Sequence, residues 1–324
     1  MLDLYGTLGP ACDRVEILEE MLRLGMTGMR LNLSHVTLPQ AEKQVEKLHQ
    51  AAARCGVKAK LLIDMQGPEL RIGAMPEPLR LPEGGTVRLG EGGIPVPDAV
   101  REKLEPGQDI LLDDGKLLLC AESEHEARIL RGGVLQSRKS IALPGCAVYL
   151  PALTESDRAN IALAAQYGVT GVMQPFVRSP EDLETVRAAL DAAGGTGISL
   201  FAKIESREGL THLETLLPAA DEIVIARGDL GNAMPLWQLP SAQKRIAAVC
   251  RAAGKPFMVV TQMLSSMEQS PVPTRAEVTD IYNAVLDGAA SLMVTGETAV
   301  GRYPVEVIRY LAATAGEAMS YREK

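Results

Sequence analysis

Short apolar runs alternate with amphipathic stretches along most of the chain, and this pattern predicts strands that are each followed by a helix. The runs are apolar throughout, which is typical of parallel strands buried on both faces. Eight such runs occupy residues 2–8, 28–35, 59–65, 169–176, 197–204, 221–227, 255–262 and 290–296. The count of eight, with a closing helix after the last run, predicts an α/β fold of the (β/α)8 TIM-barrel type. A doubly wound open sheet is the alternative.

Several predicted helices begin at residues that cap free backbone N–H groups. Asp13 is predicted to cap the first helix. Thr154 and Asp157 have the three-residue spacing of a reciprocal cap. Ser179 followed by Pro180 predicts another helix start, because proline is well tolerated at the first helical position.

One segment, residues 73–139, interrupts this rhythm after the third strand. It is rich in glycine and proline at its start and then shows short β-like runs, with a predicted hairpin turn at Asp114–Gly115. We interpret it as a small all-β domain inserted into the barrel, which then comprises residues 1–72 and 140–324. Without the insert about 257 residues remain, close to the ~250 that are typical of the barrel fold.

The composition excludes several classes of function. The net charge is −8 without blocks of one sign, and only 3% of residues are aromatic, which argues against nucleic-acid and membrane-surface partners. No apolar run approaches the roughly 18 residues of a membrane span. The first residues lack the basic segment of a secretory signal, and the five cysteines are scattered without a CxxC spacing, so we expect a reducing, cytoplasmic location.

Polar residues gather where the predicted strands end, and in this fold chemistry takes place at that end of the barrel. The strand-end residues are Arg30, Asn32, Ser34, His35, Asp64, Glu69, Arg71, Lys203, Glu205, Arg227, Asp229, Thr261, Gln262, Thr295 and Glu297. Lys203 and Glu205 lie two apart and therefore share one strand face. A single pair of this kind is commonly a solvated surface, but charges at the ends of five or six strands indicate a site.

This set of side chains suits a multiply anionic substrate and a divalent ion. Glu205 and Asp229 are hard oxygen ligands of the kind that Mg²⁺ prefers. The backbone N–H groups of Gly228 and Asp229, at a predicted helix start, can bind a carboxylate or phosphate. Positive charge comes from three side chains: Arg30, Arg71 and Lys203. The combination indicates phosphoryl transfer, in which a protein mainly positions groups and neutralises charge. No HExxH, Walker A or GxSxG motif is present in the sequence.

Seven segments resemble pyruvate kinases in order and spacing: TLGPA, RLNLSH, LIDMQGPELR, AKIESREG, ARGDLG, PTRAEVTDIYNAVLDGA and MVTGETAVGRYP. The resemblance covers the whole predicted barrel, and the insert takes the place of the family's lid domain. It implies transfer of the phosphoryl group of phosphoenolpyruvate to ADP, giving pyruvate and ATP. Because the sequence ends after the last barrel helix, the resemblance also implies that the family's C-terminal effector domain is absent, and we expect activity without effector control.

The resemblance assigns roles to individual residues. It implies that Lys203 stabilises the phosphoryl group in transfer, that Arg30 binds the phosphate, and that Thr261 organises proton delivery. Glu205 and Asp229 match the ligands of Mg²⁺ (or Mn²⁺). The matching K⁺ ligands are Asn32, Ser34, Asp64 and the backbone of Met65, with Glu69 as the residue that accompanies K⁺ dependence. His35 and Arg71 match nucleotide and phosphate contacts, and the substrate pocket corresponds to Ala226, Arg227, Gly228 and Thr261. A homodimer formed through barrel helices is expected.

Four residues depart from the family pattern. Met65 and Gln66 replace a threonine and a lysine, Pro175 replaces a serine, and Val300 replaces a lysine. Met65 still offers its carbonyl to a K⁺ ion. Gln66 removes a cation near the phosphate, so we expect a lower activity or an altered phosphate contact.

Two other interpretations stay open. A Mg²⁺-dependent lyase or aldolase acting on a 2-oxoacid enolate would use a similar site on the same barrel. A catalytically weak regulatory homologue would keep the site for sensing. Retention of Lys203 favours the kinase over the lyase, because a lyase needs no lysine to stabilise a phosphoryl group. Retention of Glu205 and Asp229 as well disfavours the regulator.

Overall fold

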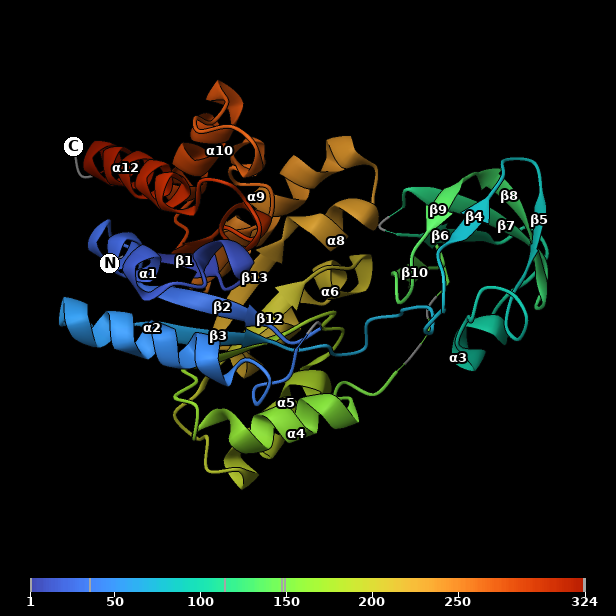
Figure 1. Ribbon diagram of the computed structural model, residues 1–324, viewed down its shortest axis with the longest axis horizontal. Helices are drawn as coiled ribbons and strands as arrows, with labels where there is room; N and C mark the ends of the chain where they lie inside the picture. Colours follow the sequence, from blue (N-terminus) through green and yellow to red (C-terminus); the bar gives the residue numbers. More distant parts are fainter. Residues whose placement is uncertain (1, 35, 114, 147, 149, 323–324) are drawn as a thin grey trace. The chain divides into compact units, whose positions relative to one another are not determined.

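The computed structural model describes residues 2–34, 36–113, 115–146, 148 and 150–322. Two compact units make up the chain (Figure 1). The barrel unit comprises Met1–Gly67 and Ala152–Lys324, and the insert unit comprises Pro68–Pro151. His35 and the Asp114 half of the predicted hairpin turn lie outside the described residues.

Eight parallel strands close into a barrel, which confirms the predicted fold and excludes the open sheet. Their order around the barrel is β1-β15-β14-β13-β12-β11-β3-β2. Their bounds are β1 Asp3–Thr7, β2 Gly28–Asn32, β3 Lys60–Asp64, β11 Gly171–Gln174, β12 Ser199–Ile204, β13 Glu222–Ala226, β14 Phe257–Val260 and β15 Ser291–Met293. The ring closes where the first strand pairs with the last, with Asp3 opposite Ser291 and Tyr5 opposite Met293.

Two apolar layers explain why the strands are apolar on both faces. Tyr5, Phe201 and Met258 belong to a buried cluster contributed by the strands alone. The opposite strand faces pack against the helices in a much larger cluster, to which Leu61 and Ile223 belong. A strand with one solvated face would need polar residues at alternate positions, which these strands lack.

Helices follow the strands and surround them (Figure 1). The α-helices of the barrel unit are α1 Val15–Arg23, α2 Glu42–Cys55, α4 Glu155–Ala164, α5 Pro180–Ala192, α6 Arg207–Thr211, α7 Leu213–Leu216, α8 Arg227–Asn232, α9 Leu239–Ala252, α10 Arg275–Leu286, α11 Gly296–Ala299 and α12 Pro304–Arg322. Short 3-10 helices are η1 Pro10–Cys12, η2 Leu217–Ala219, η3 Leu236–Gln238 and η4 Ser265–Glu268. In the part of the chain that the structure describes, no helix is both long and apolar enough to cross a membrane.

The predicted helix starts have different outcomes. Thr154 and Asp157 form the reciprocal cap of α4, as predicted. Ser179 occupies the cap position of α5 with Pro180 behind it, although the serine side chain caps no backbone group. The prediction for Asp13 was wrong: the cap position of α1 is Arg14, and the Asp13 carboxylate instead pairs with Lys47 of α2 at 2.9 Å. The long-range ion pair therefore replaces the local cap.

The insert unit is mostly β-structure, built around its own core. Its strands are β4 Leu79–Leu81, β5 Thr86–Arg88, β6 Asp109–Leu112, β7 Leu117–Ser123, β8 Glu126–Arg131, β9 Gly133–Leu135 and β10 Ile141–Ala142, with one short helix, α3 Asp98–Arg101. Five of them form an antiparallel sheet in the order β10-β6-β7-β8-β5, and β4 pairs with β9. Ile110, Leu119 and Ile129 are among the buried residues that hold the unit together.

Candidate active site

Lys203 on β12 lies between two carboxylates at the carboxyl end of the barrel. Its Nζ atom is 3.0 Å from Glu205 Oε1 and 3.0 and 3.1 Å from the two carboxylate oxygens of Asp64 on β3. Burial alone would lower the pKa of Lys203, but the two carboxylates outweigh burial and raise it above its usual value. Lys203 is therefore a permanent cation with its charge held at a fixed place, and only 12% of its side chain is exposed.

Asp64 joins Lys203 to a second cation. Arg30 on β2 donates from Nε at 2.9 Å and from Nη2 at 2.5 Å to the same oxygen of Asp64. Burial would raise the pKa of Asp64, yet Lys203 and Arg30 together lower it, so the carboxylate stays ionised. The β2–β3 pairing explains this contact, because it places Asn32 opposite Asp64 and Arg30 two residues earlier on the same face.

Glu205 is a buried carboxylate whose negative charge is only partly compensated by nearby positive charge. Its side chain is 2% exposed, and Phe176 N–H donates to Oε2 at 2.9 Å. Burial, with Asp229 and Asp64 nearby, raises the pKa of Glu205 to about 7 even though Lys203 opposes the shift. A divalent cation between Glu205 and Asp229 would supply the missing positive charge.

The available ligands suit an open Mg²⁺ site better than a metal site made entirely of protein ligands. Among the described residues there is no group of three or more His, Cys, Asp or Glu that could hold a metal ion by itself. Magnesium is commonly held by one or two carboxylates, while water and substrate phosphates complete the octahedron. Two carboxylates match that requirement: Glu205, directly after β12, and Asp229, in the first turn of the short helix α8.

The four residues predicted to form the substrate pocket lie at the ends of β13 and β14: Ala226, Arg227, Gly228 and Thr261. The Arg227 side chain, 11% exposed, donates to the Thr261 carbonyl from Nε at 3.1 Å and from Nη2 at 2.7 Å, and pairs with Asp280 at 2.6 Å. Thr261 and Gln262 have positive φ angles of 78° and 55°, which are rare for residues with a side chain. The guanidinium of Arg227 therefore holds a strained turn in place.

The predicted K⁺ ligands lie on two neighbouring strand ends. Asn32 ends β2, Asp64 ends β3, and Leu33 N–H donates to the Asp64 carbonyl at 2.9 Å. The Asn32 Oδ1 atom accepts from Ser34 N–H at 3.1 Å. Side-chain and carbonyl oxygens of this kind suit K⁺, which carbonyl dipoles can bind in place of water.

The other predicted contact residues belong to the insert unit or lie outside the described residues. Glu69 and Arg71 belong to the insert unit, where they pair with each other at 2.8 Å. His35 is outside the described residues. Two buried polar residues of α4 beside the β2 and β3 loops, Asp157 and Asn160, were not identified as part of the site from sequence.

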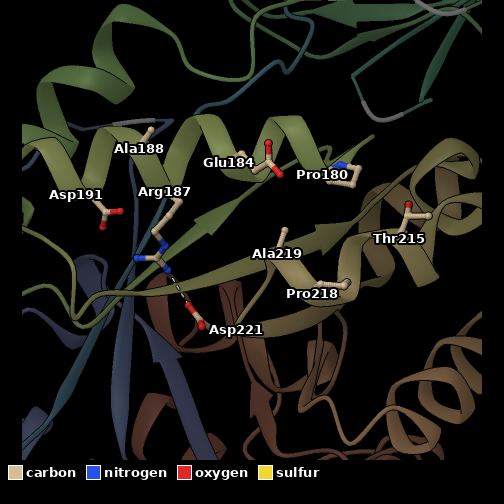
Figure 2. A pocket seen from close by; sticks show the side chains of 9 residues that line it. All are labelled: Pro180, Glu184, Arg187, Ala188, Asp191, Thr215, Pro218, Ala219 and Asp221. Atoms are coloured by element: carbon tan, nitrogen blue, oxygen red, sulfur yellow. Dashed lines mark hydrogen bonds and ion pairs between the residues drawn. The ribbon is translucent and has the colours of Figure 1, made fainter.

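A hollow in the barrel unit lies away from this cluster. Its volume is about 560 Å³, and it is lined by residues of α5 together with Thr215, Pro218 and Ala219 (Figure 2). Arg187 and Asp221 pair in it at 2.8 Å. Asp221 immediately precedes β13, so the hollow reaches the amino ends of the strands, opposite the candidate active site.

Comparisons with known proteins identify relatives of this chain. The family model "Pyruvate kinase, barrel domain" matches residues 2–308. A protein named pyruvate kinase from Aeropyrum pernix is 40% identical over 97% of this chain and 70% of its own length. Proteins of the same name from Geobacillus stearothermophilus and Leishmania mexicana are 35% and 36% identical over 98% and 97% of this chain. The chain spans 57% and 66% of the lengths of these two relatives.

Proposed function

We propose that this chain, which belongs to the pyruvate kinase family, transfers the phosphoryl group of phosphoenolpyruvate to ADP. The observation that carries the proposal is the buried ammonium of Lys203 at hydrogen-bond distance from two carboxylates. A fixed cation in a low-dielectric site stabilises negative charge that develops on a phosphoryl group. Arg30, bound to Asp64 beside it, adds a second cation.

The proposed reaction breaks one bond to phosphorus, forms another and transfers one proton. The bond between phosphorus and the enol oxygen of phosphoenolpyruvate breaks, and a bond forms between phosphorus and a terminal oxygen of ADP. The enolate that is left takes one proton at its methylene carbon and becomes pyruvate. We assign organisation of this proton transfer to Thr261, whose backbone Arg227 holds in place.

We further propose two kinds of cation as cofactors. Glu205 and Asp229 would hold Mg²⁺ or Mn²⁺, which draws charge from the phosphate and substrate oxygens. Asn32, Ser34, Asp64 and the Met65 carbonyl would hold K⁺. The family's dimer and a reducing cytoplasmic location remain part of the proposal, and the latter agrees with five free thiols.

A coupled assay tests the function. Lactate dehydrogenase and NADH report pyruvate formed from millimolar phosphoenolpyruvate and ADP with Mg²⁺ and K⁺ present. We expect turnover that requires ADP and Mg²⁺ and increases with K⁺. Pyruvate release that does not need ADP would instead favour lyase chemistry, and no turnover under any of these conditions would favour the regulatory homologue.

A further inference from the structure

Helix α4 presents two polar side chains on its buried face, one turn apart. Asp157 and Asn160 are 0% and 1% exposed. Buried polar groups are costly unless they are hydrogen-bonded, so the partners of these two residues indicate what they do. All the partners identified below are backbone groups or neutral side chains.

Asp157 holds the loop that follows β3. Its Oδ1 accepts from Gln66 N–H at 2.8 Å, and its Oδ2 accepts from Gly67 N–H at 2.9 Å. The same Oδ2 also accepts from the backbone N–H and the hydroxyl of Thr154, at 2.9 and 2.8 Å. Asp157 forms no ion pair within the described ranges. Its carboxylate is instead stabilised by hydrogen bonds from the β3 loop and from Thr154 at the start of α4.

Asn160 holds the loop that follows β2. Its Oδ1 accepts from Leu38 N–H at 2.8 Å, while its Nδ2 donates to the Ser156 carbonyl at 2.8 Å. The bond to Ser156 fixes which end of the amide faces Leu38, because only the nitrogen can donate to a carbonyl. The amide therefore acts as a rigid acceptor for one loop.

One helix therefore ties together the two loops that bear the proposed K⁺ ligands. The β2–β3 ladder aligns Asn32 with Asp64 and ends with the hydrogen bond from Leu33 N–H to the Asp64 carbonyl, while Met65 N–H donates to the Met173 carbonyl of β11 at 3.1 Å. Beyond it, Ser34 and Met65 lie on loops. A cation whose ligands come from both loops binds well only if this spacing is kept within a narrow range.

We propose that Asp157 and Asn160 are positioning residues for the monovalent-cation site, acting through the backbone of the β2 and β3 loops. This inference rests on the proposed function, since that function assigns K⁺ to Asn32, Ser34, Asp64 and Met65. It extends the site to a helix that contributes no ligand.

The test uses Asn160→Ala, Asn160→Asp and Asp157→Asn, with Glu155→Gln as the matched control. Glu155 is exposed in the first turn of α4, so its change removes a charge beside the helix start without touching either loop. Asn160→Asp keeps an acceptor for Leu38 N–H but loses the donor to the Ser156 carbonyl, so it separates the two roles of the amide. If Asp157→Asn does not fold, the two Asn160 variants decide the question.

The first readout is the K⁺-dependent rise in melting temperature without substrates, measured against choline chloride to hold ionic strength constant. The second is the K⁺ concentration for half-maximal activity. Asn160→Ala should raise roughly tenfold the K⁺ concentration that gives a set rise in melting temperature. The K⁺ concentration for half-maximal activity should rise by the same factor, as expected when an outer-shell partner of a metal site is lost. The kcat at saturating K⁺ should stay within about twofold of wild type, because the reacting groups are untouched. Glu155→Gln should match wild type, and Asn160→Asp should lie closer to wild type than to Asn160→Ala.

Hydrogen exchange shows whether the loop was released. We expect faster exchange at the Leu38 amide in Asn160→Ala. Faster exchange with unchanged K⁺ dependence would overturn the proposal, and so would a loss of kcat that saturating K⁺ does not restore. A wild-type enzyme that makes ATP but ignores K⁺ would refute the inference and leave the function standing. A wild type that binds K⁺ as described but makes no ATP would refute the function alone.

Discussion

Glu222 at the start of β13 is a buried carboxylate, and the free-energy cost of burying its charge should depend on pH. Ser291 Oγ on β15 donates to its carboxylate. The charged groups that face it are Asp3 on β1 and Lys60 on β3, which pair with each other at 2.6 Å, and Tyr5 lies close by. Burial is the main cause that raises the pKa of Glu222 to about 7; Asp3 adds to the shift, whereas Ser291 and Lys60 oppose it.

The size and sign of the effect follow from the shift. The pKa rises from 4.5 to about 7 on folding, and each unit corresponds to about 1.36 kcal/mol. The folded state therefore binds this proton more tightly, so the contribution of Glu222 to stability is fully present below pH 4.5 and is lost as the pH rises through about 7. Above pH 7 the ionised carboxylate costs about 3 kcal/mol. Glu222→Gln keeps an acceptor for the Ser291 hydroxyl and removes this cost.

Thermal melting from pH 5 to pH 8.5 measures the effect. Wild type and Glu222→Gln should melt at similar temperatures near pH 5. At pH 8 the variant should melt roughly 6 °C higher, since about 2 °C per kcal/mol is typical of a large domain. Glu214→Gln, an exposed carboxylate on α7, is the control and should show no such divergence. Wild-type and Glu222→Gln curves that stay parallel across the range would refute the reasoning.

Two further changes test the site. Glu205→Gln should raise the Mg²⁺ concentration for half-maximal activity by more than about tenfold, because even outer-shell changes cost that much in metal affinity; a titration with unchanged half-saturation would exclude Glu205 as a ligand. Arg227→Lys should lower kcat by between about tenfold and a hundredfold, because one ammonium cannot replace the guanidinium that bonds twice to the Thr261 carbonyl and also pairs with Asp280. Unchanged steady-state kinetics in Arg227→Lys would show that the strained turn does not need this support.

The strands and the centre of the site could be predicted because their signals are local. An apolar run that is buried on both faces is visible in the sequence, and so is the two-residue spacing of Lys203, near the end of β12, and Glu205, directly after it. The contact between Arg30 and Asp64 required only that β2 and β3 be parallel neighbours in register, whereas Lys203 on β12 reaches Asp64 past the intervening strand β11.

Other features depend on partners far along the chain. Asp13 has the local pattern of a cap but pairs with Lys47, 34 residues away. Asn160 bonds to Leu38 across 122 residues, and nothing near it in the sequence indicates that partner. The chain between β12 and β13 forms two short helices, α6 and α7, separated at His212, although the sequence contains no helix breaker at that point.

The central claim is that Lys203, with Glu205 and Asp229, serves phosphoryl transfer. The most direct measurement is the yield of ATP and of pyruvate from the same incubation with phosphoenolpyruvate, ADP, Mg²⁺ and K⁺, for wild type and Lys203→Met. We expect one ATP for each pyruvate in wild type, and a rate lower by a factor of about 10² to 10³ in Lys203→Met, as for loss of one preorganised group that stabilises transition-state charge. Pyruvate formed without ATP, or a Lys203→Met enzyme as fast as wild type, would contradict the claim.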